Sequence, residues 1–398
     1  MGRAALMEME GFRWLLSDAG QQLLAELSND RDLNEANFLR YTTKLRKHYP
    51  AEAVTAALET NLLRRAAQAK FPQASQLYFT REALEQATPW LVASYRQRHF
   101  ATGSRLVDLG CSVGGDALAL AQSCSVLAID RDPLRLAMLE ANAQALGLSQ
   151  QISIQEADFT TLEFAGYAGL FIDPARRSNG KRIWDVEHYQ PPLSTLERWR
   201  GQVPIHGAKV APGIPDDAVP AGYDLEFISL DGDLREACLW WQAGQVGGQR
   251  KAVVLTSAGA EHSLIADSTQ AAAALSEPLA YLYEPDPAVI RAHAVADIAN
   301  QLDLAQFDAS IAYLTSDRLV QSPFLRAWQI EQWLPFNLKL LRQILQAREI
   351  GRVTVKKRGS PITPEELSKQ LRLKGRYEQT LVLTKLQGQP VVLLVKLL

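Results

Sequence analysis

The fold is decided by one stretch, Val107-Asp108-Leu109-Gly110-Cys111-Ser112-Val113-Gly114-Gly115-Asp116. Apolar residues lead to an acid, glycines follow, and apolar residues at helical spacing begin near Asp116. Glycine accepts tight and left-handed backbone conformations, so such a segment turns a strand into a helix within a few residues. The stretch therefore predicts a strand over 105–109, a tight turn and a helix over 116–122.

Short apolar runs and helical patterns keep alternating after this turn. Strands are expected at 125–129, 152–155, 170–172, 208–210, 225–229 and 252–256, and a helix at 133–146. Parallel strands joined by crossover helices form an open, doubly wound sheet, so the sequence predicts a Rossmann-like α/β domain over 101–277. A turn at 244–250 predicts a hairpin that pairs 237–241 antiparallel with 251–255.

The two ends of the chain follow other patterns. Residues 1–100 carry apolar residues at helical spacing, punctuated by Pro50 and Pro72, and predict a helical N-terminal region. The C-terminal end mixes helices and strands and is divided into 278–323 and 324–398. Helices are expected at 288–301, 338–347 and 364–373, and strands at 324–328, 352–356, 381–386 and 391–397. Thr363 is the expected N-cap of the helix at 364–373.

Composition excludes several classes of protein. Hydrophobic residues make up 47% of the 398 residues, but no apolar run approaches the roughly 20 residues of a transmembrane helix. Cys111, Cys124 and Cys238 form no C-x-x-C pair, so neither a zinc site nor a disulfide framework is expected. No metal-ligand spacing and no signal-peptide layout is visible. The sequence therefore predicts a cytoplasmic protein without a metal or a membrane span.

Charge is spread unevenly. Residues 339–398 hold 13 basic and 4 acidic residues, a net charge of +9, so the rest of the chain carries −11 of the total of −2. A basic end on an acidic body indicates an anionic partner for that end. The alternative is a basic face that is simply solvated.

Acids follow three successive strands of the predicted sheet. Asp108 precedes the glycine turn, where it would repel a phosphate but suits a cationic amino acid moiety. Asp130, with Arg131 beside it, follows the next strand, where a carboxylate can accept both hydroxyls of a ribose. Asp158 and Phe159 follow the third, where they suit an adenine amino group and ring. The set favours S-adenosylmethionine over a nicotinamide cofactor.

This stretch resembles the class I S-adenosylmethionine-dependent methyltransferases. Their loop reads Asp/Glu-x-Gly-x-Gly-x-Gly, and here Asp108, Gly110 and Gly114 match it, with Ser112 in place of the middle glycine. The resemblance implies that these four residues line the cofactor site.

Asp173-Pro174-Ala175-Arg176-Arg177 follows the fourth strand, whose end faces the methyl group in this fold. The string resembles the Asp/Asn-Pro-Pro-aromatic motif of amino-methylating enzymes. That resemblance implies that Asp173 and Pro174 hold a target nitrogen, which attacks the methyl group in line. Because Arg176 replaces the aromatic residue, Arg176 and Arg177 are expected to stack on a base or to bind phosphate. The alternative is an Asp-Pro turn with solvated arginines.

Other chemistries lack their residues. No cysteine lies in a motif for methylation at pyrimidine C5, and no Ser/His/Asp hydrolase arrangement is visible. His188 and His206 are interpreted as structural or solvent-facing.

From Lys70 onward the chain resembles a narrower group, the bacterial class I methyltransferases with a C-terminal THUMP-like domain. The resemblance is carried by Lys70-Phe71, Tyr78-Phe79-Thr80, 84–88, the glycine loop, 173–177, Lys209-Val210-Ala211-Pro212-Gly213-Ile214 and 352–359. It implies a helical region, the Rossmann-like domain, a ferredoxin-like segment over 278–323 and a THUMP-like end over 324–398. Residues 78–80 and 85–88 are expected to close over the cofactor, and an equal alternative is that Thr80 caps a helix.

The THUMP-like resemblance also implies RNA binding. Arg352, Lys356, Lys357 and Arg358 end a strand in a basic loop that suits phosphate. The leading hypothesis is therefore a methyltransferase for a base nitrogen of RNA, such as tRNA or rRNA. A methyltransferase for a protein or small molecule, a non-catalytic RNA-binding protein and, remotely, a nicotinamide oxidoreductase remain alternatives. The sequence predicts no oligomeric state.

Overall fold

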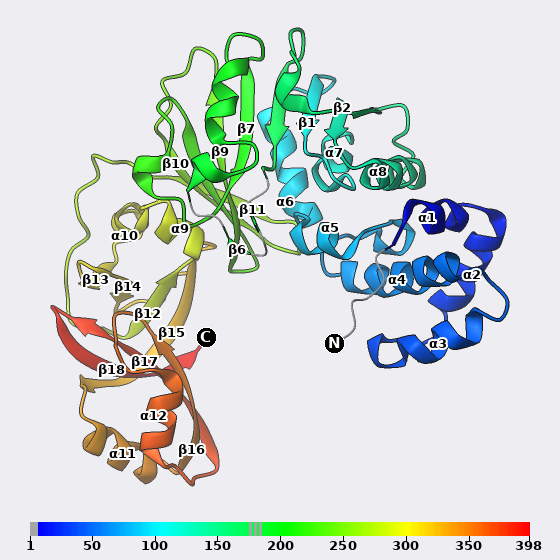
Figure 1. Cartoon of the computed structure of the whole chain (residues 1–398). Helices are drawn as coiled ribbons and strands as arrows, with labels where there is room; N and C mark the ends of the chain where they lie inside the picture. The colour runs from blue at the N-terminus through cyan, green and yellow to red at the C-terminus, as the bar shows by residue number, and fades with distance from the viewer. Residues whose placement is uncertain (1–6, 175–176, 179–180, 183–184) are drawn as a thin grey trace. The chain divides into compact units, whose positions relative to one another are not determined.

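The computed structural model describes residues 7–174, 177–178, 181–182 and 185–398, with side chains outside 175–184 (Figure 1). The chain divides into two compact units. The first comprises Met1–Tyr223 and Ala237–Gly247, and the second comprises Asp224–Glu236 and Gly248–Leu398.

The first unit begins with helices, as the sequence predicted. They are α1 (Met9–Leu15), α2 (Asp18–Ser28), α3 (Phe38–Leu45), α4 (Ala51–Ala67), α5 (Arg81–Gln86) and α6 (Trp90–Tyr95). Helix α4 starts directly after Pro50, whose fixed φ suits a helix N-terminus, and α1, α2 and α3 all contact it. Because α4 is covered by its neighbours, even Thr60 and Asn61 on it are buried.

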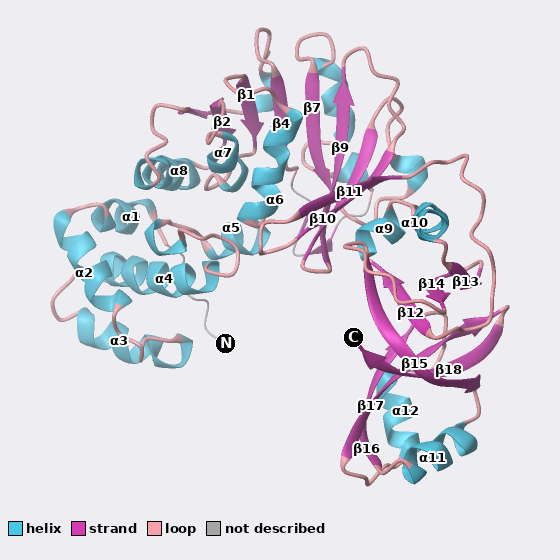
Figure 2. Cartoon of the chain, turned by 180° about the vertical axis from the view of Figure 1, so that it is seen from behind, coloured by secondary structure: helices cyan, strands magenta, loops and turns pink. Residues whose placement is uncertain are grey.

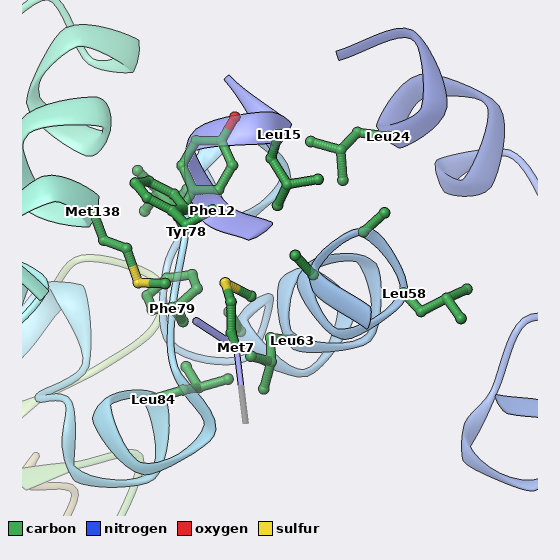
Figure 3. Close-up of a cluster of buried hydrophobic side chains, with 14 of the residues drawn as sticks. Met7, Phe12, Leu15, Leu24, Leu58, Leu63, Tyr78, Phe79, Leu84 and Met138 are labelled. Atoms are coloured by element: carbon green, nitrogen blue, oxygen red, sulfur yellow. The ribbon is translucent and has the colours of Figure 1, made fainter. Parts of the chain in front are cut away.

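These helices share one hydrophobic core with the α/β layer that follows. Figure 3 shows Met138, from α8 (Pro133–Ala145), among N-terminal side chains such as Phe12, Tyr78 and Phe79. The rings of Phe12 and Tyr78 meet edge to face at 5.3 Å. Asn142 on α8 fixes the arrangement, because its amide bonds both main-chain groups of Tyr78 and the carbonyl of Val113. Residue 78 is thereby held against the glycine turn.

The sheet of the first unit has the predicted parallel strands. Six strands of a nine-stranded sheet are β1 (Arg105–Leu109), β2 (Ser125–Asp130), β3 (Ile152–Glu156), β4 (Gly169–Ile172), β7 (Ile205–Val210) and β9 (Asp233–Gln242), in the order β9-β7-β4-β1-β2-β3. All are parallel except β9, which is antiparallel to β7. Helix α7 (Gly115–Leu120) follows β1. The carboxyl ends of β1, β2, β3 and β4 therefore lie at one edge of the sheet, where the acids were predicted. Two short strands, β5 (Arg177–Ser178) and β6 (Lys181–Arg182), pair beyond β4.

One predicted pairing is wrong. Strand β10 (Arg250–Leu255) pairs with β8 (Asp224–Leu230) in parallel and with β11 (Glu261–Ile265) antiparallel, while β9 pairs with β7. The segment between β9 and β10 does not form a tight hairpin turn. Gly247 lies so close to Gly222 that a Cβ atom would approach the Gly222 carbonyl carbon to 2.3 Å. The chain therefore passes along residue 222 before β10 begins.

The second unit carries a separate seven-stranded sheet, seen from behind in Figure 2. Its strands are β12 (Tyr281–Pro285), β13 (Ala305–Asp308), β14 (Ile311–Ser316), β15 (Leu325–Pro335), β16 (Ile350–Lys357), β17 (Tyr377–Leu386) and β18 (Gln389–Leu397), in the order β13-β14-β12-β15-β18-β17-β16. Strands from 278–323 and from 324–398 thus share one sheet. The boundary between these two segments, like the boundaries at 100 and 277, stays a prediction.

The helices of the second unit are α9 (Pro287–Arg291), α10 (Val295–Leu302), α11 (Leu338–Ala347) and α12 (Pro364–Leu371). Of these, α10, α11 and α12 contact strands of this sheet, and α9 contacts β8 and β10. The single helix predicted over 288–301 is wrong, because His293 has a φ of 63° and separates α9 from α10. Thr363 caps α12 as predicted, in a capping box with Glu366. Among the helices that the structure describes, none has the length and apolar character needed to cross a bilayer.

Candidate active site

The glycine turn after β1 has the backbone that its sequence predicts. Gly110, Ser112 and Gly114 have φ values of 76°, 51° and 95°. Ser112 therefore adopts the left-handed conformation that the usual middle glycine would adopt without strain. A Cβ atom on Gly110 would lie 3.6 Å from the carbonyl oxygen of Asp173 and 3.9 Å from the Phe159 ring. The turn thus brings together residues predicted at three different strand ends.

Asp130 ties the turn to the end of β2. Its Oδ2 accepts from the backbone N–H of Ser112 at 2.8 Å, and its Oδ1 accepts from that of Asp132 at 3.0 Å. Each carboxylate oxygen keeps a further lone pair. The predicted contact of Asp130 with ribose hydroxyls is compatible with this geometry and stays a prediction.

Asp108 is an acid without a hydrogen-bond donor for one of its oxygens. Its side chain is 2% exposed, and within the described residues its Oδ2 has no hydrogen-bond partner. Burial raises the pKa of Asp108 to about 7, with Arg96 opposing the shift and Asp173 and Asp130 adding to it. The hydroxyl of Ser112 is also buried without a partner. Buried polar atoms of this kind are costly, so the pair indicates a ligand with polar, cationic groups.

Asp158 has the opposite environment. Its carboxylate is exposed, lies 2.6 Å from the Arg131 guanidinium and accepts from Thr160. These hydrogen bonds lower its pKa to about 2. Arg131 thus reaches from the end of β2 to the end of β3, and Phe159 beside it is buried. The predicted cofactor contacts of Arg131, Asp158 and Phe159 are compatible with this edge and stay predictions.

Thr80 caps α5, because its side chain accepts from the backbone N–H of Ala83 at 3.1 Å. Of the two interpretations of this residue, capping is confirmed, whereas its predicted contact with the cofactor stays a prediction. The other end of α5 is held by Lys70, whose Nζ donates to the carbonyls of Leu84, Glu85 and Ala87. The segment predicted to lie over the cofactor is thus fixed at both ends.

Asp173 follows β4 and is paired with a lysine that the sequence analysis did not single out as a site residue. Nζ of Lys209, on β7, donates to Asp173 Oδ2 at 2.7 Å and to Thr88 Oγ1 at 2.9 Å. The Lys209 side chain is 5% exposed, and that of Asp173 is 28% exposed. Lysine is almost never buried without a partner. A lone lysine inside the apolar strand 205–210 was the available signal, but its partner is 36 residues away.

The remaining residues of the predicted motif are only partly visible. Pro174 is buried beside Asp173. Ala175 and Arg176 lie outside the described residues, and so does the side chain of Arg177. The predicted roles of Pro174, Arg176 and Arg177 therefore stay predictions.

Comparisons with known proteins decide the family. An S-adenosylmethionine-dependent methyltransferase of Mycobacterium tuberculosis, known from two strains and described as uncharacterised, is 37% identical over 346 residues. The alignment covers 83% of this chain and 92% of that protein. The chain belongs to the S-adenosylmethionine-dependent methyltransferases.

Family models match three parts of this methyltransferase. Residues 8–67 match a domain of unknown function, residues 103–194 match the RNA cap guanine-N2 methyltransferases, and residues 325–397 match the THUMP domain-like family. The crystal structure of a putative methyltransferase from Porphyromonas gingivalis has the same fold, with a TM-score of 0.75 at 21% identity. It covers 92% of this chain, and the match spans 99% of that structure. The predicted fold class, family and cofactor are thereby confirmed.

The basic segment predicted to bind RNA lies at the end of β16 in the THUMP-like part of the methyltransferase. Lys356 and Arg358 both pair with Glu284, the latter at 3.7 Å, and Arg352 lies 3.3 Å from Glu378. Lys357 is exposed, and no ion pair to an acid is seen for it in the described part of the chain. Only part of the formal charge of this segment is therefore left for a ligand.

Other residues of the methyltransferase fit structural roles. His206 is buried against the Trp199 carbonyl, and burial lowers its pKa to about 4. Burial also raises the pKa of the Cys111 thiol, which disfavours a thiolate nucleophile at the turn. Within the ranges that the structure describes, no three His, Cys, Asp or Glu side chains are grouped to hold a metal ion.

Proposed function

We propose that this methyltransferase transfers the methyl group to a base nitrogen of RNA. The observation that carries the proposal is the Asp173 carboxylate. It lies at the end of β4, beside the Gly110 bend, and its charge is already matched by Lys209. An acid with a built-in counter-ion suits a neutral N–H donor better than a second cation. The matches of residues 103–194 to RNA cap guanine-N2 methyltransferases and of residues 325–397 to THUMP-like domains support RNA as the acceptor.

The chain's own residues would orient the reaction. Asp108 and the Ser112 hydroxyl, both with unmatched buried oxygens, fit the amino acid moiety of S-adenosylmethionine. When bound, that cofactor supplies a methyl group on a sulfonium centre. Asp173 would accept a hydrogen bond from the target nitrogen. This bond would direct the lone pair of the nitrogen toward the methyl group of the cofactor at the glycine turn. Holding two reactants in line in this way supplies much of the rate enhancement. The proton displaced from the nitrogen leaves to Asp173 or to water.

RNA would be held by phosphate contacts in the THUMP-like part. Residues 339–398 carry a net charge of +9. Lys357 is exposed and has no ion pair to an acid among the described residues, and Arg352 is exposed although it pairs with Glu378. Exposed ion pairs are weak, so a phosphate can displace Glu378 from Arg352 at little cost.

The acceptor is tested with labelled S-adenosylmethionine and two substrate pools, total RNA and total protein, from cells that lack the gene. We expect label in RNA with the wild-type chain and none with Asp173→Asn, and digestion then names the nucleoside. Label in protein alone would reject RNA as the acceptor. Equal labelling by the Asp173→Asn variant would reject the role of Asp173.

The contact surface is tested separately by RNA binding at several salt concentrations. We expect Arg352→Gln with Lys357→Gln to weaken binding and to reduce the salt dependence by about one unit of slope per lost contact. Lys44→Gln with Lys47→Gln is the matched control, because it removes two exposed charges from α3 and the turn that follows it. Equal losses in both variants would mean that only net charge matters and would reject a specific surface at β16.

A further inference from the structure

We infer that Lys209 and Thr88 form the device that positions Asp173, and that the segment before the Rossmann-like sheet thereby completes the acceptor site. This inference rests on the proposed function. Asp173 is the residue that touches the target nitrogen, whereas Lys209 and Thr88 act through it and are positioning residues.

The geometry around Lys209 is that of a fixed support. Its ammonium group lies between Asp173 Oδ2 at 2.7 Å and Thr88 Oγ1 at 2.9 Å, and Thr88 is itself 3% exposed. Lysine is normally a flexible, strongly hydrated side chain. Here two partners on different segments stop its rotation. Because one oxygen of Asp173 is bound to this support, the carboxylate cannot swing. Among the described residues Oδ1 has no hydrogen-bond partner, so it can accept from the target nitrogen.

Thr88 is in turn held from the N-terminal side. Lys70 bonds the carbonyl of Ala87 with its Nζ at 3.0 Å, and its own carbonyl accepts from the backbone N–H of Trp90 at 2.8 Å. The residues on both sides of Thr88 are thus tied to one lysine. A Cβ atom on Gly115 would lie 3.9 Å from the Ala87 side chain, which places this segment at the first turn of α7. Thr88, which supports Asp173 through Lys209, therefore belongs to a segment that lies beside the glycine turn.

A purely structural lysine would not need this arrangement. Inside an apolar strand such as β7, an aliphatic side chain would cost less to bury than an ammonium group. The ammonium group is instead aimed at the one carboxylate that follows β4, and that carboxylate is 28% exposed, so it is accessible to a ligand. The positioning role predicts an effect on the chemical step that exceeds any effect on folding or cofactor affinity.

The test compares Thr88 variants of the full chain, with labelled S-adenosylmethionine and total RNA from cells that lack the gene. Thr88→Val keeps the shape but removes the hydroxyl, and both charges of the ion pair remain. We expect kcat to fall roughly tenfold to a hundredfold, because small misplacements at a reacting centre have effects of this size. The KM for the cofactor should stay within about twofold. Thr88→Ser should restore most of the rate, since serine keeps the hydroxyl.

Thr55→Val is the matched control. Thr55 is also a buried threonine, but its hydroxyl bonds the Ala51 carbonyl within α4 at 3.0 Å. We expect wild-type kcat for this variant. Wild-type kcat in Thr88→Val would overturn the inference, and so would a loss that Thr88→Ser does not rescue.

A double-mutant cycle gives a second measurement. Lys209→Met should lower kcat at least as far as Thr88→Val does, and the double variant Lys209→Met with Thr88→Val should fall no further than Lys209→Met, because Thr88 acts on Asp173 through Lys209. Multiplying losses would overturn the inference. If Lys209→Met does not fold, the Thr88 series decides alone.

The outcomes separate this inference from the proposed function. If the wild-type chain does not label RNA, the proposed acceptor is refuted. The variants are then compared on the protein fraction that takes the label, where the same split between kcat and KM is expected. RNA labelled equally by the wild-type chain and by Thr88→Val refutes the positioning role and leaves the proposed acceptor intact.

Discussion

Two carboxylates on neighbouring strands have opposite surroundings. Strands β1 and β4 are parallel, with Leu109 opposite Ile172. Asp108 on β1 is buried, and within the described residues no donor reaches its Oδ2. Asp173 after β4 is partly exposed and is bound by Lys209 at 2.7 Å. One edge of a sheet therefore holds a buried acid with an oxygen that no described donor reaches beside an acid that is bound by a lysine.

The difference indicates which charges the ligands bring. The cationic amino acid moiety of the cofactor would supply the hydrogen-bond donor that Asp108 Oδ2 lacks among the described residues. A second cation is not needed at Asp173, so a neutral N–H group is the better partner there. Four experiments test the contrast between Asp108 and Asp173 and the roles of the residues around them.

The largest effect is expected at Asp173. Asp173→Ala should abolish methyl transfer, and it should lower the free energy of unfolding by about 3 kcal/mol, because it leaves the charge of Lys209 buried without a counter-ion. Adding Lys209→Met should recover most of the stability and none of the activity. Urea denaturation and labelled transfer measure the two quantities. If the single and double variants are equally stable, the ion pair is not a buried one in solution.

Asp108→Asn should act in the opposite way on stability. We expect the Kd for S-adenosylmethionine to rise about tenfold to a hundredfold, as is usual for a lost charge-assisted hydrogen bond. The free energy of unfolding at pH 8 should stay equal or increase, because a buried carboxylate with one oxygen that no described donor reaches becomes a neutral amide. Calorimetry and denaturation test both. Asp132→Asn is the control, since Asp132 caps α8 and pairs with Arg135 on the same helix, and asparagine keeps the cap. A loss of stability in Asp108→Asn would show that the chain itself stabilises the charge of Asp108 by more than its burial costs.

The pH dependence of cofactor binding should follow Asp108. Its pKa of about 7 lies above the ordinary value of 3.8, so the free protein holds a proton there below pH 7. The ionised form suits a cation, so cofactor affinity should fall by up to about tenfold per pH unit below pH 7. The contribution of Asp108 to stability has the opposite sign: it is fully present below 3.8 and is lost as the pH rises through 7. Asp158, with a pKa of about 2, should add nothing between pH 5 and 8.

Binding calorimetry from pH 5 to 8 on the wild-type chain and on Asp108→Asn measures this dependence. An unchanged slope in the variant would assign the titration to another group.

The smallest effect is expected at Thr80. Thr80→Ala should lower the free energy of unfolding by about 1 kcal/mol through loss of the α5 cap, and Thr80→Asp should retain it. The cofactor Kd should change in neither variant, because the Thr80 hydroxyl is bound to the Ala83 N–H. Weaker cofactor binding in both variants would instead mean that Thr80 contacts the cofactor.

Features that depend on near neighbours along the chain could be predicted from the sequence. The turn from β1 to α7 needs glycine or another small residue at positive φ, so 108–116 predicts its own conformation. The acids at 108, 130 and 158 follow apolar strands directly, and parallel strands place such ends at one edge. Helix α12 has its capping residue beside it in the sequence.

Only the tertiary structure decided features that depend on distant segments. The pairing of β10 with β8 rather than with β9 depends on the path of the chain past Gly222. The sequence predicts free charges at Lys356 and Arg358, whereas in the fold both pair with Glu284, which is more than 70 residues away in the chain. The contacts of Lys209 with Asp173 and Thr88 span 36 and 121 residues. A sequence pattern records what a residue's neighbours along the chain require, whereas the partner of a buried charge is set by which strands and helices pack together.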